Sequence, residues 1–338
     1  MGKRKRQGHK RHHHFLPQLY LCGFTESLTS PMLWVYERDR NYSPGLGSET
    51  CNPYRRSVTQ AGMQRDFYAY QRSDGSMDYE TFENALEQEE KQYDRLLKKL
   101  REFKPLIGDE KARFTRYITM MLKRVPRSME KALALWPKVV DEEWERLRNE
   151  LGTRQMRAEA VGDEESLKLV QSLKERVDET MVQRQGVMPD KLRLTSMLRA
   201  MPRMEDVILA MRWQYLRAPI GEFFVTSDNP VFYFEGWGFN KPYSEFTFPI
   251  SSNLAIVGSW HHNEPECIID VTSAHVREVN RRATRSALRF VYARAADRHI
   301  YDLLNSDDGH YLFYPPLANG QRLWNLFSDP NQVDNLRM

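Results

Sequence analysis

The sequence has few cysteines and no long apolar run. Its three cysteines, Cys22, Cys51 and Cys267, form no CxxC pair, and an odd number argues against a disulfide framework. No window reaches the roughly 18 uncharged apolar residues that a membrane-spanning helix needs. The run HFLPQLYLCGF is interrupted by Pro17 and Gln18, so it is not the core of a signal peptide. We therefore expect reduced thiols, a cytoplasmic location and no membrane partner.

The sequence also lacks a strong excess of one charge. Its 50 Lys and Arg residues nearly balance 46 Asp and Glu residues, and a net charge of +4 is weak support for a nucleic-acid partner. The charge is uneven, however, because six basic residues precede the first acid, Glu26: Lys3, Arg4, Lys5, Arg6, Lys10 and Arg11. Such an arm can bind phosphates through counterion release, but a disordered solubilising tail has the same composition. Both interpretations stay open.

Apolar patterning divides the chain into strand-rich ends and a helical middle. Short aromatic and β-branched runs favour strands, among them LYLCGF, MLWVYER, GEFFV, EFTFPIS and NLAIVGSW. We expect an α+β protein in which N- and C-terminal strand zones form one sheet or barrel-like core, with a long helical insertion between them. A separate helical domain is the alternative. The expected segments are a basic, disordered arm (1–13), an N-terminal strand zone (14–76), a helical region (77–218), C-terminal strands and a long helix of the same core (219–304), and an irregular tail (305–338).

Three of the expected helical segments bear on function. Apolar periodicity predicts a helix over residues 203–216, and a longer one from Thr272 to Ala295 that is capped at Asp270 or Thr272. Residues 154–185 are highly charged with a thin apolar seam, which predicts an exposed helical arm or a coiled-coil-like hairpin.

A polar turn within FFVTSDNPVFYF is the first candidate site. An apolar run leads directly into Thr226-Ser227-Asp228-Asn229-Pro230, after which apolar residues resume. Asp and Asn side chains can bond their own backbone and stabilise a tight turn before proline. The functional interpretation makes Asp228 a general base, an orienting residue or a metal ligand at a strand end. Both interpretations remain open at this stage.

The segment HHHFLPQLYL is the second candidate. A histidine with a near-neutral pKa suits proton transfer, and a tyrosine can donate a hydrogen bond to an oxyanion, which singles out His14 and Tyr20. The three consecutive histidines are poor metal ligands as a set, because neighbours in an extended chain point to opposite faces. The alternative makes His12, His13 and His14 part of the basic arm.

Arginines in the predicted helix at 272–295 are the third candidate. Arg277, Arg281, Arg285 and Arg289 recur at intervals of four and would form one stripe, where like charges repel. Bound phosphates would offset the repulsion, but so would protein carboxylates or solvent. Familiar catalytic signatures are missing: we find no zincin helix, no phosphate loop and no GxSxG nucleophile elbow.

Several of these motifs, in this order, resemble those of a widespread, mainly bacterial family known only as a domain of unknown function. HFLPQLYLCGF is similar to its His-x-x-Pro-x-x-Tyr-Leu-x-x-Phe opening, and FFVTSDNPV to its Phe-Ile-Thr-Ser-Asp-Asn-Pro-Val motif. LWVYER, RDFYAY, ITMMLKRVPR, FPISSNLAIV and EVNRRATRSALRFVYAR resemble further segments, although Ser252 replaces a proline. The resemblance points to His14, Pro17, Tyr20, Asp66, Tyr68, Arg124, Arg127, Ser227, Asp228, Asn229 and Asn280. It also implies a setting among phage-defence genes.

Two hypotheses follow. The first is a nucleic-acid-directed hydrolase, a nuclease-like effector of phage defence that acts on RNA or DNA. Its catalytic residues would be His14, Tyr20, Asp228 and Asn229, its substrate-binding residues Arg124, Arg127, Ser227, Asn280 and Arg281, and its candidate cofactor a divalent metal ion. The second is a non-enzymatic binding or sensor module that recognises a phage or host component through the charged helical arm. The first requires His14, Tyr20, Asp228 and Asn229 to converge; if they are scattered or buried, the motifs are folding devices.

Overall fold

A computed structural model describes residues 11–27, 31–42, 52–184, 188–241, 244–260 and 265–306, together with short strands at 317–318 and 321–322. The basic arm up to Lys10, Cys51 and most of the predicted tail lie outside these residues. The chain divides into two compact units, one comprising Met1–Arg127 with Ser196–Met338 and the other Ser128–Thr195. The expected mixed α/β class, with a helical region between two strand zones, is confirmed.

A four-stranded antiparallel sheet joins the two ends of the sequence. Its order is β3 (Tyr54–Ser57), β2 (Met32–Glu37), β13 (Phe290–Ala293) and β8 (Thr226–Ser227). Trp34 of β2 pairs with Ala293 of β13, and Ser227 of β8 pairs with Val291. N- and C-terminal strands therefore share this sheet, as expected.

A second, five-stranded sheet contains only strands from the C-terminal half. Its order is β12 (Ile268–Asp270), β7 (Arg212–Arg217), β11 (Leu254–Ser259), β10 (Glu245–Ser251) and β9 (Phe232–Tyr233), with only the β12–β7 pair parallel. Every residue of β10 and β11 is buried, so both strands are covered on their two faces. The described strands thus form several sheets; the smaller pairs are β1 (His12–His14) with β4 (Met63–Arg65), β5 (Tyr70–Gln71) with β6 (Met77–Asp78), and β14 (Leu317–Ala318) with β15 (Gln321–Arg322).

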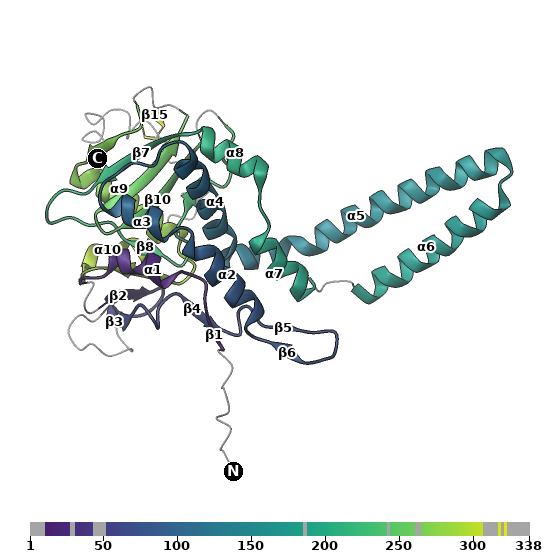
Figure 1. Ribbon diagram of the computed structural model, residues 1–338, viewed down its shortest axis with the longest axis horizontal. Helices are drawn as coiled ribbons and strands as arrows, with labels where there is room; N and C mark the ends of the chain where they lie inside the picture. The colour runs from purple at the N-terminus through teal and green to yellow at the C-terminus, as the bar shows by residue number, and fades with distance from the viewer. Residues whose placement is uncertain are drawn as a thin grey trace, which may run out of the picture. The chain divides into compact units, whose positions relative to one another are not determined.

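Helix α9 (Ser273–Ser286) packs against both sheets (Figure 1). Its first half buries Val276 and Val279 in one apolar cluster with residues of β7 and β11. Its second half buries Ala283 in another cluster with residues of β2 and β13. Two neighbouring residues of the segment that leads into β8 follow the same division, with Phe224 in the first cluster and Val225 in the second. The helix and this segment therefore hold the two sheets together.

Three of the predicted segments are wrong in type, among them GEFFV, whose residues 221–225 form no strand before β8 begins at Thr226. LYLCGF is not a strand: helix α1 (Gln18–Leu21) and a 3-10 turn (Cys22–Phe24) occupy it. Pro17 stands at the N-terminal boundary of α1 with φ near −58°, and its carbonyl accepts the Leu21 N–H at 3.1 Å. The helix predicted over 203–216 ends early, because α8 (Pro202–Ala210) is followed by β7.

The remaining helices of the first unit are α2 (Thr81–Lys91), α3 (Asp94–Arg101), α4 (Asp109–Lys123) and α10 (Arg298–Asn305). Helices α4 and α8 lie side by side (Figure 1). Helix α4 is largely buried: of the nine positions from Phe114 to Leu122, eight are buried and only Arg116 is partly exposed. Among the described residues, no helix combines the length and apolar character needed to cross a bilayer.

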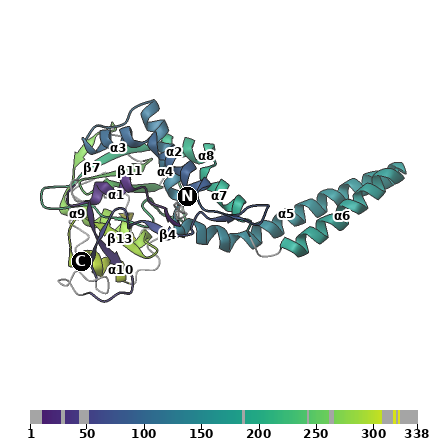
Figure 2. The same cartoon turned by 60° about the horizontal axis from the view of Figure 1, so that its bottom comes forward.

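The second unit is a helical hairpin. Helix α5 (Pro126–Val161) begins at the unit boundary, α6 (Glu164–Arg184) returns alongside it, and α7 (Asp190–Leu198) leads out (Figure 2). Arg148 of α5 pairs with Asp178 of α6 at 2.9 Å, which fixes the antiparallel register. The buried side chains of the hairpin are few, among them Leu151 and Val170. It is the hairpin form of the charged arm expected from the sequence.

Candidate functional site

Asp228 anchors the segment between α9 and β13. It is 2% exposed, and its carboxylate accepts three backbone N–H groups, from Leu288 on Oδ1 (2.8 Å) and from Arg289 and Phe290 on Oδ2 (2.8 and 2.9 Å). These donors are freed because α9 ends at Ser286. The helix predicted to reach Ala295 is therefore wrong beyond Ser286. A carboxylate from another part of the chain ends it, and residues 290–293 continue as a strand.

Ser227 and Asn229 tie the rest of the turn to the end of α9. The Ser227 hydroxyl donates to the Asn229 carbonyl at 2.9 Å and accepts the Asn229 N–H at 3.2 Å. The Asn229 amide donates to the carbonyl of Ser286 at 3.2 Å, and the Ser286 hydroxyl donates back to the Asn229 carbonyl at 2.9 Å. The polar groups of the turn thus bond mainly to backbone, which is what a folding device requires.

Burial raises the pKa of Asp228 to about 6, although the three N–H bonds act in the opposite direction. The nearest cation that lowers it is Arg38. Arg38 itself donates to the carbonyls of Ala287 (3.0 Å) and Leu304 (2.5 Å), so it closes the C-terminal ends of α9 and α10. Asp228 is therefore a buried carboxyl with a near-neutral pKa, held against backbone donors.

Tyr20 connects the turn motif to the second sheet. Its hydroxyl lies 2.7 Å from Thr226 Oγ1 in β8 and donates to the carbonyl of Pro249 in β10 at 2.8 Å. The ring is fully buried, and burial raises its pKa well above the ordinary value. The structure thus brings Tyr20 to Thr226, at a position where it joins two sheets. It does not bring Tyr20 into hydrogen-bond contact with Asp228 or Asn229, as far as the described residues show.

His14 belongs to a different cluster. Its Nε2 lies 3.2 Å from the Thr59 carbonyl, and its Nδ1 lies 3.9 Å from Glu83 Oε1. Arg124 is buried and donates to the His14 carbonyl at 2.7 Å, while its other nitrogen pairs with Glu90. The Tyr68 hydroxyl points to the same carbonyl at 3.4 Å. Three motif positions, His14, Tyr68 and Arg124, therefore meet here and not at the Asp228 turn.

The other predicted site residues are dispersed over the first unit. Arg127 pairs with Glu235 at 3.3 Å. The Asn280 side chain accepts the Val225 N–H and donates to the Phe223 carbonyl, both at 2.9 Å, so it holds the segment that leads into β8. Arg281 lies on α9 with a partly buried side chain, and its carbonyl accepts the Thr284 hydroxyl at 2.9 Å.

Of the four arginines predicted to form a stripe on one helix, only the first three lie on α9. Arg277, Arg281 and Arg285 lie on α9, and the Arg285 guanidinium donates to the carbonyl of Ser306. Arg289 follows the helix end and lies at the start of β13. Its guanidinium pairs with Glu37 of β2.

Arg289 belongs to a group of arginines that rest on aromatic rings. Its side chain is 62% exposed, lies 5.1 Å above the Phe290 ring and donates to Glu37 at 2.8 Å. Arg40 pairs with the same Glu37 at 2.8 Å and lies 5.2 Å above the Tyr54 ring. The Arg40–Glu37 pair is local, three residues apart, whereas Glu37 and Arg289 are brought together only by the pairing of β2 with β13.

Arg298 completes this group at the start of α10. Its guanidinium lies 4.4 Å above the Tyr42 ring and 5.6 Å from the Tyr301 ring, and these two rings are 5.0 Å apart. The side chain is 62% exposed and pairs with Asp302 at 3.0 Å. We call Arg40, Arg289 and Arg298, with the partly exposed rings of Tyr42, Phe290 and Tyr301, the arginine–aromatic face; the Tyr54 ring beneath Arg40 is buried. The Arg298–Tyr301 spacing of three on a helix was a signal in the sequence that we did not use.

A buried ion cluster was also missed. Arg282 is fully buried, lies 3.2 Å from Glu245 and 3.0 Å from Glu278, and donates to the Thr247 hydroxyl at 2.8 Å. Its guanidinium also lies 5.4 Å from the Phe234 ring. Burial raises the pKa of Glu245 to about 7, against the opposing effect of Arg282. The cluster joins α9 to β10, and its Arg282–Glu245 pair is buried, which suits a structural role.

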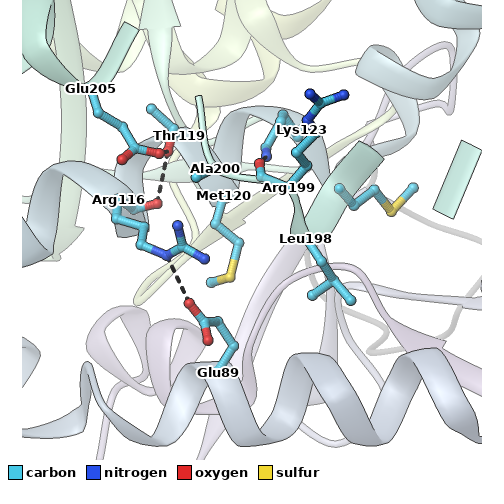
Figure 3. Close-up of a pocket in the computed structure, with 10 residues that line it drawn as sticks. Glu89, Arg116, Thr119, Met120, Lys123, Leu198, Arg199, Ala200 and Glu205 are labelled. Carbon is cyan, nitrogen blue, oxygen red and sulfur yellow. Dashed lines mark hydrogen bonds and ion pairs between the residues drawn. The ribbon is translucent and has the colours of Figure 1, made fainter. Parts of the chain in front are cut away.

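A small pocket lies between α4 and the α7–α8 connection (Figure 3). Its volume is about 10 Å³, and Arg116 on its wall pairs with Glu89 at 2.9 Å. Burial lowers the pKa of Lys123 to about 8, although its ammonium donates to the carbonyls of Ser196 (3.2 Å) and Arg199. The pocket is below the roughly 300–1,000 Å³ of typical ligand sites. Nor do the residues that the structure describes contain a group of three or more potential metal-ligating side chains.

Fold and sites together describe a mixed α/β protein with several sheets, a helical hairpin and an exposed arginine–aromatic face. The chain belongs to the family described as "Protein of unknown function (DUF4238)", whose model matches residues 12–297. The expected membership of a domain-of-unknown-function family is thereby confirmed. No curated protein and no solved structure matches the chain.

Proposed function

We propose that the protein binds nucleic acid at the arginine–aromatic face. The observation that supports this proposal is the placement of Arg289 and Arg298, each 62% exposed and each resting on an aromatic ring. A guanidinium is planar, stacks on rings and bases, and can donate two parallel hydrogen bonds to a phosphate. Cation–π stacking holds it flat and leaves its outer N–H groups for a ligand.

The acids beside these arginines do not prevent phosphate binding. Asp302 forms an exposed ion pair with Arg298, and such pairs contribute about 0–1 kcal/mol, so a phosphate can replace Asp302 at small cost. Glu37 is buried and also pairs with Arg40, so at Arg289 a phosphate would bind beside Glu37 and not in its place. Asp228 supports the face from inside, because it fixes the backbone N–H of Arg289 and so the point from which that side chain leaves the sheet.

Binding is tested with a matched pair of arginines. Arg298 pairs with Asp302 and Arg154 with Glu150, both at a spacing of four and with side chains 62% and 60% exposed, but only Arg298 rests on aromatic rings. We expect Arg298→Gln to weaken binding of labelled single-stranded RNA or DNA in fluorescence anisotropy and to reduce the salt dependence by about one phosphate contact. Arg154→Gln should leave both unchanged. Equal losses in the two variants, or no binding by the unmodified chain, would contradict the proposal.

The more specific form of this proposal is a nucleic-acid hydrolase in phage defence. His14 would be its general acid or base, with Glu83 3.9 Å from its Nδ1 as the orienting carboxylate, and a divalent metal ion would be its candidate cofactor. Nuclease assays with and without a chelator compare the unmodified chain with His14→Ala. Cleavage that is unaffected by His14→Ala would sink the assignment while leaving the binding proposal intact.

A second candidate is the binding or sensor module that acts through the hairpin. It is favoured by large apolar side chains that are exposed on its distal half, Met156 (64%) and Leu169 (60%). Phage challenge of cells that carry Met156→Glu or Arg298→Gln separates the two candidates. Protection lost only with Met156→Glu favours the hairpin, and protection lost only with Arg298→Gln favours the arginine–aromatic face.

A further inference from the structure

Helix α5 carries an apolar belt that its own hairpin leaves uncovered. Residues 132–140, ALALWPKVV, contain one charged residue, Lys138. Leu133, Leu135 and Val139 are 45%, 58% and 46% exposed, although the segment is helical throughout. A helix that is apolar on all sides is normally buried, so the belt lacks a covering element among the described residues.

The register of the hairpin explains why the belt is uncovered. Helix α5 has 36 residues and α6 has 21. The pairs Arg148–Asp178 and Gln155–Lys174 place the last residue of α6, Arg184, opposite about residues 142–145 of α5. The belt begins N-terminal to that point. The partner helix therefore ends just before the most apolar part of α5.

The belt also contains a helix-breaking residue. Pro137 lies inside α5 and has no N–H to donate to the carbonyl of Leu133, and a proline inside a helix costs about 3 kcal/mol. The neighbouring Trp136 has its indole N–H buried without a hydrogen-bond partner in the described part of the chain. A segment with these costs needs favourable packing to stay helical, and the hairpin supplies little of it here.

We infer that the belt is an isologous interface, covered by the same belt of a second copy of this chain. Ala132, Leu135 and Val139 recur at intervals of three and four, which is the spacing of an antiparallel helix pair. With the two α5 helices crossing near Pro137, Leu135 of one copy faces Val139 of the other. A two-fold axis makes each contact occur twice.

Charge complementarity favours a second copy over other partners. Lys131 precedes the belt, and Asp141, Glu142 and Glu143 follow it. Antiparallel crossing near Pro137 sets Lys131 of each copy opposite Glu143 of the other, whereas a parallel pair would set the acids against each other. A nucleic acid is disfavoured because the belt offers a single cation.

The size of the belt sets the expected affinity. Its large side chains can bury on the order of 1,000 Å² in total over both copies, the lower end for specific interfaces. We therefore expect a dissociation constant of about 1–100 μM, not an obligate dimer. This inference is independent of the proposed nucleic-acid function, because no residue of the arginine–aromatic face lies on α5.

The experiment is sedimentation equilibrium of the full chain over about 1–200 μM, bracketing that affinity. Leu135→Glu should weaken self-association at least tenfold, whereas Met156→Glu, at 64% against 58% exposure on the same helix, should not. Circular dichroism confirms that both variants keep their helices, as exposed positions should. A chain that stays monomeric throughout, or equal effects of the two variants, would overturn the inference.

A charge-reversal pair tests the antiparallel register in the same assay. Lys131→Glu and Glu143→Lys should each weaken association several-fold, and the double variant should recover it. The two residues are twelve apart on α5, about 18 Å along a helix, so recovery reports a contact between copies. Failure of the double variant to recover would refute the antiparallel crossing.

Discussion

Replacing Asp228 by Asn removes a titrating group from the anchor between α9 and β13. The pKa of this carboxyl is raised from its ordinary value of 3.8 to about 6 by burial. The folded chain thus holds the proton more tightly than the unfolded chain does. The contribution of Asp228 to stability is then fully present below about pH 4 and is lost as the pH rises through 6.

The magnitude follows from the size of the shift. About two pKa units at 1.36 kcal/mol each correspond to about 3 kcal/mol. Asn cannot ionise, yet it keeps one carbonyl oxygen for the N–H groups of residues 288–290, much as the protonated carboxyl does. We therefore expect the unfolding free energy of wild type, relative to Asp228→Asn, to fall by about 3 kcal/mol between pH 4 and pH 7.

Urea denaturation followed by tryptophan fluorescence at several pH values measures this difference. Asp78→Asn is the control of opposite sign: burial acts to raise the pKa of Asp78, but hydrogen bonds from Thr81 and Arg72 hold it well below its ordinary value. The contribution of Asp78 is present above about pH 4 and is lost as the pH falls. If the unfolding free energy of wild type relative to Asp228→Asn instead rose with pH, the three N–H bonds would outweigh burial and lower the pKa of Asp228. That result would refute the reasoning.

Three further substitutions test how the sheets are joined. Tyr20→Phe removes the hydroxyl that contacts Thr226 and the β10 backbone, and should cost about 1–3 kcal/mol of unfolding free energy with no pH dependence between 5 and 8. Asn280→Leu leaves the Phe223 carbonyl and the Val225 N–H unpaired, and native-state hydrogen exchange should show residues 223–225 opening first. Arg282→Met leaves Glu245 buried and unpaired, at a cost of about 3–5 kcal/mol, and adding Glu245→Gln should recover part of the loss in the same denaturation assay.

The sequence predicted elements well where the local pattern is strong. EFTFPIS and NLAIVGSW became β10 and β11, and the charged segment became a helical hairpin, because burial on both faces and helical spacing are local properties. The end of α9 was missed for a physical reason: residues 287–295 have helix-compatible composition, and the carboxylate that stops the helix lies some sixty positions earlier. The sequence of either segment alone does not indicate such a contact.

The candidate sites show the same limit. The motifs named both Tyr20 and the Thr226 turn, but only the fold shows that one hydroxyl joins them across 206 positions. Local chemistry suggested that His14 and Asp228 could work together, whereas the fold brings His14 to Arg124 at the end of α4. In the arginine–aromatic face, the contact between Arg289 and Glu37 could not be predicted because it depends on β2 meeting β13.

The pairing of β2 with β13 also has a consequence for synthesis of the chain. Tyr36 cannot pair with Val291 until Val291 has left the ribosome. The two are roughly 250 residues apart, which takes about 10–50 s to synthesise at 5–20 residues per second. During that interval β2 and β3 can pair with each other but present an open apolar edge. Nascent chains that stop before residue 290 should therefore bind chaperones, and the four-stranded sheet should form only when β13 emerges.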